Sequence, residues 1–237
     1  MTRLRATARG RVHLALRAAC EPDEMRITHL GHACVLVEAA DTRVLIDPGA
    51  FSDLWHETAD LDAVLITHQH ADHVDPEHAP ALIEANAQAA VYTADDVERS
   101  LLLPRAESVT PGQRVTVGNV EIEAVGGNHA IIHDDIPRIH NIGFVLRAAD
   151  EPVFFHPGDA LDTAPAGVDV LALPVMGPWA AMKEHVEFVR ALDVPTYSIP
   201  VHDELLSDRG RDLLSRQIGD LTGTKVVGLR DGGSQVF

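Results

Sequence analysis

Three histidines and one aspartate within six residues constrain this chain more than any other feature. His68, His70, Asp72 and His73 follow directly after the apolar run 63–66, which has the length and composition of a buried strand. Imidazole and carboxylate groups hold zinc, iron or manganese, and a turn that leaves a strand can direct neighbouring side chains toward one point. At this chain's own histidine and aspartate content, H-x-H-x-D-H would arise by chance in roughly one such sequence in 200. The cluster therefore predicts a metal site that is completed by ligands from elsewhere in the chain.

Composition limits the class of protein. With 46% hydrophobic residues among 237, the chain is large enough for one globular domain with its own core. Charged residues make up 23% and no run approaches eighteen apolar residues, so neither disorder nor a membrane span is expected. The formal net charge of -17 would repel phosphate backbones, and the few basic residues are scattered. We therefore expect a small-molecule substrate and neither nucleic acid nor membrane as a partner, while the oligomeric state cannot be read from the sequence.

The first 24 residues differ from the rest, because they contain five arginines and no acid before Glu21. His13 and Arg17 interrupt the apolar stretch that a secretory signal would need, and two cysteines are too few for a disulfide framework. Both features favour a cytoplasmic location. We expect residues 1–24 to be an N-terminal extension without a role in the fold, and residues 25–237 to form one domain.

From Met25 onward, short β-rich runs alternate with helical stretches. Strands are predicted at 27–30, 34–38, 44–46, 63–67, 91–93, 115–117, 120–125, 143–146, 153–156, 168–173 and 196–199, with a closing strand near the end, and helices at 76–90, 94–103, 179–192 and 207–218. Two sets of strands with interleaved helices favour an α/β fold in which two packed sheets are covered by outer helices, a four-layer αββα sandwich.

Three further candidate ligands lie just beyond predicted strands, where binding groups gather. They are His129 after the glycine pair 126–127, Asp159 after the run 153–156, and His202 after the run 196–201. Together with the cluster they supply five imidazoles and two carboxylates.

These residues, in this order, resemble the metallo-β-lactamase superfamily of metal-dependent hydrolases over essentially all of residues 25–237. The family's H-x-H-x-D-H is present at 68–73, followed by its later single histidine, its bridging aspartate and its last histidine. The opening segment 28–33 and the segments 174–176 and 199–202 are most similar to the small single-domain branch that includes L-ascorbate-6-phosphate lactonase.

The resemblance implies two mixed sheets and a site for two divalent metal ions, zinc in the first place, with manganese or iron as alternatives. One ion would be held by His68, His70 and His129, the other by Asp72, His73 and His202, with Asp159 bridging both. A hydroxide shared by the ions would attack a carbonyl or phosphoryl group. Asp72 would receive or orient the proton of the attacking water. Independently of the resemblance, His133 is the candidate that protonates the leaving group, and the alternative is a plain loop position or a hydrogen bond to a metal ligand.

Other positions keep two interpretations. His32 either approaches the metals or stabilises a turn, and Asp47 either supports the metal loop or merely forms a turn. Trp179 either lines the pocket or belongs to the core. Arg138 and Lys183 are the candidates to bind a phosphate, should the substrate carry one.

The expected function is hydrolysis of a small-molecule ester, lactone or phosphodiester. Only 35 residues (203–237) follow His202, too few for the helical domain of glyoxalase-type relatives, and Asp159 stands where the true β-lactamases commonly have cysteine. Two alternatives remain: an iron-dependent sulfur dioxygenase of the same fold, which needs one metal, and a non-catalytic, metal-stabilised ligand-binding module.

Overall fold

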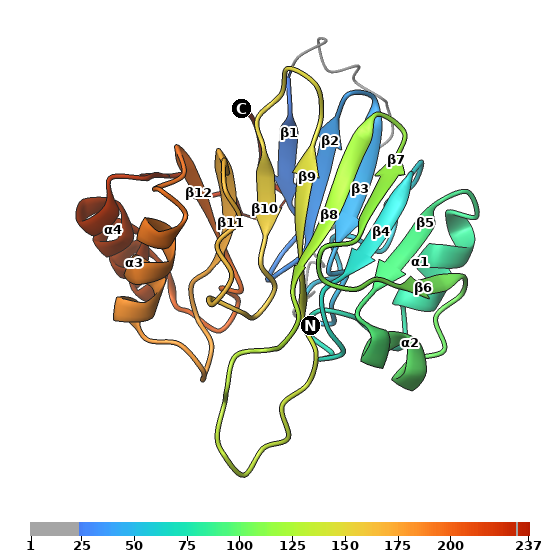
Figure 1. The fold of residues 1–237 in the computed structure, drawn as a ribbon, viewed down its shortest axis with the longest axis horizontal. Coiled ribbons are helices and arrows are strands. Elements are labelled where there is room, and N and C mark those ends of the chain that lie inside the picture. Colours follow the sequence, from blue (N-terminus) through green and yellow to red (C-terminus); the bar gives the residue numbers. More distant parts are fainter. Residues whose placement is uncertain (1–23, 231) are drawn as a thin grey trace, which may run out of the picture.

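Two seven-stranded sheets dominate the computed structural model, which describes residues 24–230 and 232–237 (Figure 1). The first has the strand order β14-β1-β2-β3-β4-β5-β6 and the second β13-β12-β11-β10-β9-β8-β7. The strands are β1 Arg26–His29, β2 Val35–Ala39, β3 Thr42–Ile46, β4 Ala63–Ile66, β5 Ala90–Thr93, β6 Ala106–Ser108, β7 Arg114–Val117, β8 Val120–Gly126, β9 Ile142–Arg147, β10 Phe154–His156, β11 Val170–Pro174, β12 Tyr197–Val201, β13 Lys225–Val226 and β14 Ser234–Val236. The expected extension over residues 1–24 lies outside the described residues apart from Glu24.

Four helices flank the sheets, and Figure 1 shows them in two pairs on opposite sides of the strands. They are α1 Ala79–Ala85, α2 Asp95–Ser100, α3 Met182–Ala191 and α4 Asp208–Thr222. Phe188 of α3 and Ile218 of α4 pack in one buried cluster with Phe155 of the second sheet. The expected α/β sandwich with two mixed sheets is therefore confirmed. In the part of the chain that the structure describes, no helix combines the length and apolarity of a membrane span.

The helix that the sequence predicts over 76–90 is shorter in the structure, where it spans only Ala79–Ala85. Pro80 lacks a backbone N–H and fits only the first turn, so the helix begins immediately before it. The chain leaves the helix at Asn86, whose side-chain amide donates to the carbonyls of Thr58 and Leu82. The predicted helices 94–103 and 179–192 are likewise shorter than expected, whereas the last helix continues to Thr222.

The direction of the strands gathers the functional loops at one edge of the sandwich. In the first sheet β1, β3 and β4 run in the same direction, and in the second sheet β8, β10 and β12 do so. Their carboxyl ends therefore lie on common edges, where open α/β sheets bind ligands. The residues that follow these six strands are, in order, His32, Asp47, the cluster 68–73, His129, Asp159 and His202.

Candidate metal centre

The structure brings the predicted ligands into two adjoining groups. His68, His70, His129 and Asp159 form the first group; His32, Asp72, His73 and His202 form the second. Within each group one nitrogen or oxygen atom per residue lies within 4.8 Å of the others. Each group therefore has the donor types and the proximity that a divalent transition metal requires.

Asp159 lies between the two groups and contacts both. Its Oδ2 is 3.3 Å from His129 Nε2 in the first group and 3.2 Å from His202 Nε2 in the second, while its Oδ1 is 3.2 Å from His73 Nε2. The side chain is only 3% exposed. A carboxylate in this position can bind two cations at once.

Several of these polar atoms are buried without a hydrogen-bond partner among the described residues. They are Nε2 of His73, His129 and His202, Nδ1 of His202, and Oδ1 of Asp159. Buried polar atoms normally have a partner, so this concentration of unpaired ones requires a reason. Cations placed among them would satisfy these atoms, and the donor set is therefore a chemical fit for metal binding.

Asp47 fixes the orientation of His73. Its Oδ1 accepts a hydrogen bond from the Thr67 backbone N–H at 2.8 Å, and its Oδ2 accepts from Thr67 Oγ1 at 2.8 Å and lies 2.7 Å from His73 Nδ1. A proton on Nδ1 leaves the lone pair of His73 Nε2 directed at the centre. His129 is held in the same way, because its Nδ1 lies 2.6 Å from the Ala130 carbonyl. Of the two interpretations of Asp47, the structure therefore favours support of the metal loop.

The backbone around the centre is closely packed and in part strained. A Cβ on Gly49 would lie 1.8 Å from the carbonyl oxygen of Asp72, so only glycine lets these loops meet. His32, Asp47 and His202 have φ values of 51°, 52° and 57°, which residues other than glycine adopt seldom and mostly where the surroundings enforce it.

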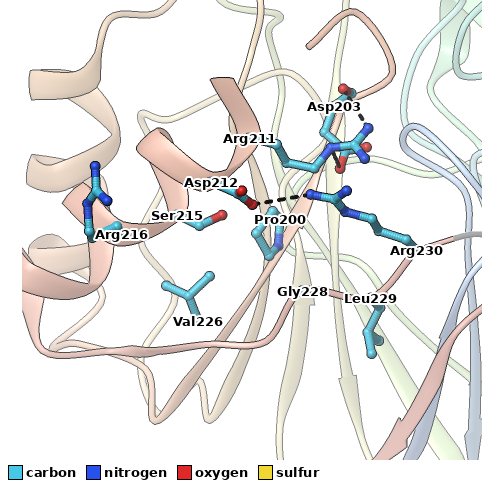
Figure 2. Close-up of a pocket in the computed structure, with 10 residues that line it drawn as sticks. All are labelled: Pro200, Asp203, Arg211, Asp212, Ser215, Arg216, Val226, Gly228, Leu229 and Arg230. Carbon is cyan, nitrogen blue, oxygen red and sulfur yellow. Dashed lines mark hydrogen bonds and ion pairs between the residues drawn. The ribbon is translucent and has the colours of Figure 1, made fainter. Parts of the chain in front are cut away.

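A buried ion pair stabilises the turn that carries His202. Asp203 is 1% exposed, and Arg211 of α4 reaches it with Nε 2.8 Å from the carboxylate and a second nitrogen 3.0 Å from the Asp203 carbonyl (Figure 2). On the other side, the His202 backbone N–H donates to the His32 carbonyl at 2.8 Å. Helix α4 and the first β-turn thus hold His202 from two directions.

Burial and neighbouring charges set the protonation of the centre. Burial, reinforced by His73, lowers the pKa of His68 well below its ordinary value, so this ring is neutral and has a lone pair to donate at pH 7. Burial opposes the charged form of His202, but the Asp159 carboxylate outweighs it and raises the pKa to about 9. A cation that binds at His202 must displace a proton, so we expect metal binding to depend on pH.

Two residues with two interpretations in the sequence, His32 and Trp179, lie at the centre. His32 Nε2 lies 3.1 Å from Asp72 Oδ2, and the centre of its ring lies 4.1 Å from that of His202, with the two planes tilted by 49°. Trp179 Nε1 donates a hydrogen bond of 3.1 Å to Asp159 Oδ2, which places the indole at the centre. The short glycine-flanked turn around His32 was the only sequence signal for the first, and no spacing rule indicated the second.

Other candidates lie apart from the two groups. His133 has a side chain 65% exposed on the loop 127–141, where its Nδ1 accepts a hydrogen bond from the Asp135 backbone N–H. Its role as a proton donor stays a prediction. Arg138 already donates to the His129 carbonyl at 2.5 Å and lies 3.5 Å from Asp162, while Lys183 is exposed on α3.

Comparison with known proteins places the chain in a family. The family model described as "Beta-lactamase superfamily domain" matches residues 26–202. "Protein Rv0786c" of Mycobacterium tuberculosis is 37% identical over 201 residues, which cover 84% of this chain and 94% of the relative. "UPF0173 metal-dependent hydrolase YtkL" of Bacillus subtilis is 28% identical over 202 residues, and the match covers 75% of this chain and 85% of the relative.

Solved structures agree about the fold. The metallo-beta-lactamase fold protein YhfI from Bacillus subtilis superposes with a TM-score of 0.69 at 16% identity, over 91% of this chain and 100% of that one. The sheet order, the position of the two histidine groups and the family match lead to the same assignment. The chain belongs to the metallo-β-lactamase superfamily.

Proposed function

We propose that this protein is a metal-dependent hydrolase that binds two divalent ions and cleaves an ester or lactone bond in a small molecule. The observation that carries the proposal is the position of Asp159, whose carboxylate lies within 3.3 Å of His129 in the first group and of His73 and His202 in the second. When bound, such ions act as Lewis acids and lower the pKa of water toward neutrality. The same donors accept zinc, manganese or iron, and we propose zinc first because imidazole and carboxylate suit it.

The residues of the chain have separable tasks in this proposal. Asp72 keeps 20% exposure where Asp159 has 3%, so it is the carboxylate that a substrate or an attacking water can reach. Despite partial burial, the neighbouring His202, 3.4 Å away, and the hydrogen bond with His32 lower the pKa of Asp72, and the ionised carboxylate can accept a hydrogen bond from that water. His32 and Asp47 are positioning residues, because they act through Asp72 and His73.

The alternatives fit the structure less well. A sulfur dioxygenase of this fold needs one metal, yet the second group has as many donors as the first. A non-catalytic binding module gives no reason for an exposed carboxylate beside buried ligands. Neither alternative is favoured by a specific observation.

Metal analysis combined with a substrate screen tests the proposal. Protein reconstituted with zinc should hold two equivalents and hydrolyse members of a panel of lactones, esters, thioesters and phosphodiesters. Asp159→Ala should lose metal and hydrolysis together while its circular dichroism is retained. His185→Leu, at a histidine that belongs to no His/Asp cluster among the described residues, should change neither metal content nor hydrolysis. Full hydrolysis by Asp159→Ala, or oxygen uptake without hydrolysis by the intact protein, would refute the assignment.

A further inference from the structure

Exposed apolar side chains gather on the loops that carry the candidate ligands. Five of the nine large exposed hydrophobic residues in the described part of the chain lie there, namely Phe51, Leu54, Ile131, Ile136 and Leu205. Ile131 follows His129 by two residues and is 59% exposed, and Leu205 follows His202 by three and is 61% exposed. The Phe51 ring lies 4.8 Å from that of His32. Scattered apolar residues need no explanation, but of these five Ile131 lines a cavity beside the candidate ligands.

A cavity of about 500 Å³ opens beside the metal centre, between the loop 127–141 and α3. Its apolar wall consists of Ala130, Ile131, Leu161, Trp179, Ala180 and Phe188. Trp179 connects the cavity to the centre, because its indole donates to Asp159. Ala130 connects it a second time, since it follows His129 and its N–H donates to the Asp159 carbonyl. The volume is in the range of pockets that bind small molecules.

The charged residues around this cavity do not suit an anion. Glu184 and Glu187 of α3 and Asp162 are acidic, and Arg138 is the one basic residue among those that line it. The Arg138 guanidinium is already engaged by the His129 carbonyl and Asp162. The acids have partners too, since Glu184 accepts from the Ala181 N–H and Glu187 lies 3.1 Å from Arg190. Three acids against one arginine still leave the lining with a net negative charge, which disfavours a phosphate or carboxylate on the substrate, whereas an uncharged apolar group would bury surface at no such cost.

We infer that the substrate carries an uncharged apolar group next to the bond that is cleaved, and that this group lies in the cavity between the loop 127–141 and α3. The inference rests on the proposed hydrolase function. It narrows the range of substrates, because a phosphate or carboxylate on the group that lies in the cavity is excluded. Ile131, Leu161 and Ala180 are then the residues that determine specificity, through contact with the apolar group and not with the reacting atoms.

An ester series tests the inference on the zinc-loaded protein. Ethyl acetate, ethyl butyrate and ethyl octanoate differ in apolar length, and monoethyl suberate has the eight carbons of octanoate with a terminal carboxylate. We expect kcat/KM to rise at least tenfold from acetate to octanoate and to fall at least tenfold from octanoate to suberate. Equal values for octanoate and suberate would overturn the inference.

Two variants locate the apolar group, each with a matched control. Ala180→Phe fills the cavity and Ile131→Asp makes its rim acidic, and each should lower kcat/KM for octanoate at least fivefold while changing acetate less than twofold. Ser215→Phe, in the separate arginine-lined cavity beside α4 of Figure 2, and Leu213→Asp, on an exposed face of α4, should leave both esters unchanged. Loss of octanoate activity that is equal in the controls would refute the location.

Binding measured without turnover separates this inference from the proposed function. N-phenyl-1-naphthylamine, a neutral fluorescent probe, should bind the wild-type protein and lose at least fivefold in affinity in Ala180→Phe but not in Ser215→Phe. This result, with no member of the panel of lactones, esters, thioesters and phosphodiesters hydrolysed, overturns the hydrolase function and supports the apolar site. Unchanged probe affinity in Ala180→Phe overturns the site. The site is also overturned if Ile131→Asp changes the oligomeric state in gel filtration but leaves kcat/KM for octanoate unchanged.

Discussion

Replacing Asp47 by asparagine should weaken metal binding, although Asp47 belongs to neither ligand group. Its two oxygens accept three hydrogen bonds, two from Thr67 and one from His73 Nδ1. An amide has one oxygen and one NH₂ group, so it cannot accept all three. If the oxygen stays with the Thr67 N–H, the NH₂ group faces His73 Nδ1, and the ring must accept there and carry its proton on Nε2. That proton occupies the lone pair that a metal needs.

If the amide turns the other way, its oxygen serves His73 and its NH₂ group faces the buried Thr67 N–H. Two donors then oppose each other at a position that is 0% exposed, which costs about 1–3 kcal/mol of folding stability. In the first orientation the cost falls on the metal, where loss of such an orienting partner typically lowers affinity by about 10–100-fold, or roughly 1.4–2.7 kcal/mol. The two orientations therefore predict losses of similar size. The first lowers the affinity for the metal, and the second lowers the folding stability.

Zinc affinity by competition with a chelator, and urea unfolding of the metal-free protein, measure the two costs separately. Asp62→Asn is the matched control, because the Asp62 carboxylate also accepts a backbone N–H, that of Arg43, and Asp62 belongs to no His/Asp cluster among the described residues. We expect the control to retain zinc affinity within twofold. An Asp47→Asn variant with unchanged zinc affinity and unchanged stability would refute the reasoning.

Three further outcomes are expected. His185 of α3 is 2% exposed, and burial lowers its pKa from 6.5 to about 4, so its stabilising effect is present above pH 6.5 and is lost as the pH falls toward 4. Between pH 7 and pH 4, the free energy of unfolding measured in urea should therefore fall by about 3 kcal/mol less for His185→Leu than for wild type. An equal fall in the two proteins would contradict this. Gly49→Ala should cost about 2 kcal/mol or more and abolish zinc binding in calorimetry, since its Cβ would collide with the Asp72 carbonyl; normal binding would disprove the contact. Chelation should lower the melting temperature but leave the protein folded at 25 °C. The free energy of unfolding should fall by about 2.7 kcal/mol if the ion had been present at 100 times its Kd, and a metal-free protein that is disordered at 25 °C would contradict this.

The sequence predicted the fold to the extent that its signals were local. Apolar runs identified the long strands, and their order favoured the sandwich. Strands β6 and β13, with three and two residues, were missed because such short segments are strands only through their neighbours in the sheet. The helix boundaries were wrong where one residue overrode the apolar spacing, as Pro80 did at the start of α1.

The candidate site was predictable in the same uneven way. The cluster 68–73 was evident because its members are adjacent, and the single ligands were found because they follow strands. The contact between His32 and Asp72 joins residues 40 positions apart, and the one between Trp179 and Asp159 joins residues 20 apart on either side of β11. Each contact joins the loops that follow two strands of the same sheet, β1 and β4 for the first and β10 and β11 for the second, so it depends on the order and direction of these strands, which no spacing in the sequence encodes.

The strained positions indicate that the sheets form the centre before any metal arrives. His32, Asp47 and His202 each adopt a positive φ, which costs on the order of 1–3 kcal/mol per residue unless the surroundings enforce it. The surroundings here are protein groups: His202 N–H on the His32 carbonyl, Thr67 on Asp47, and Arg211 on Asp203. None of these contacts involves an atom that a metal would bind. Ligand positions fixed in this way require little rearrangement on metal binding, so the ions would enter a site that is already assembled.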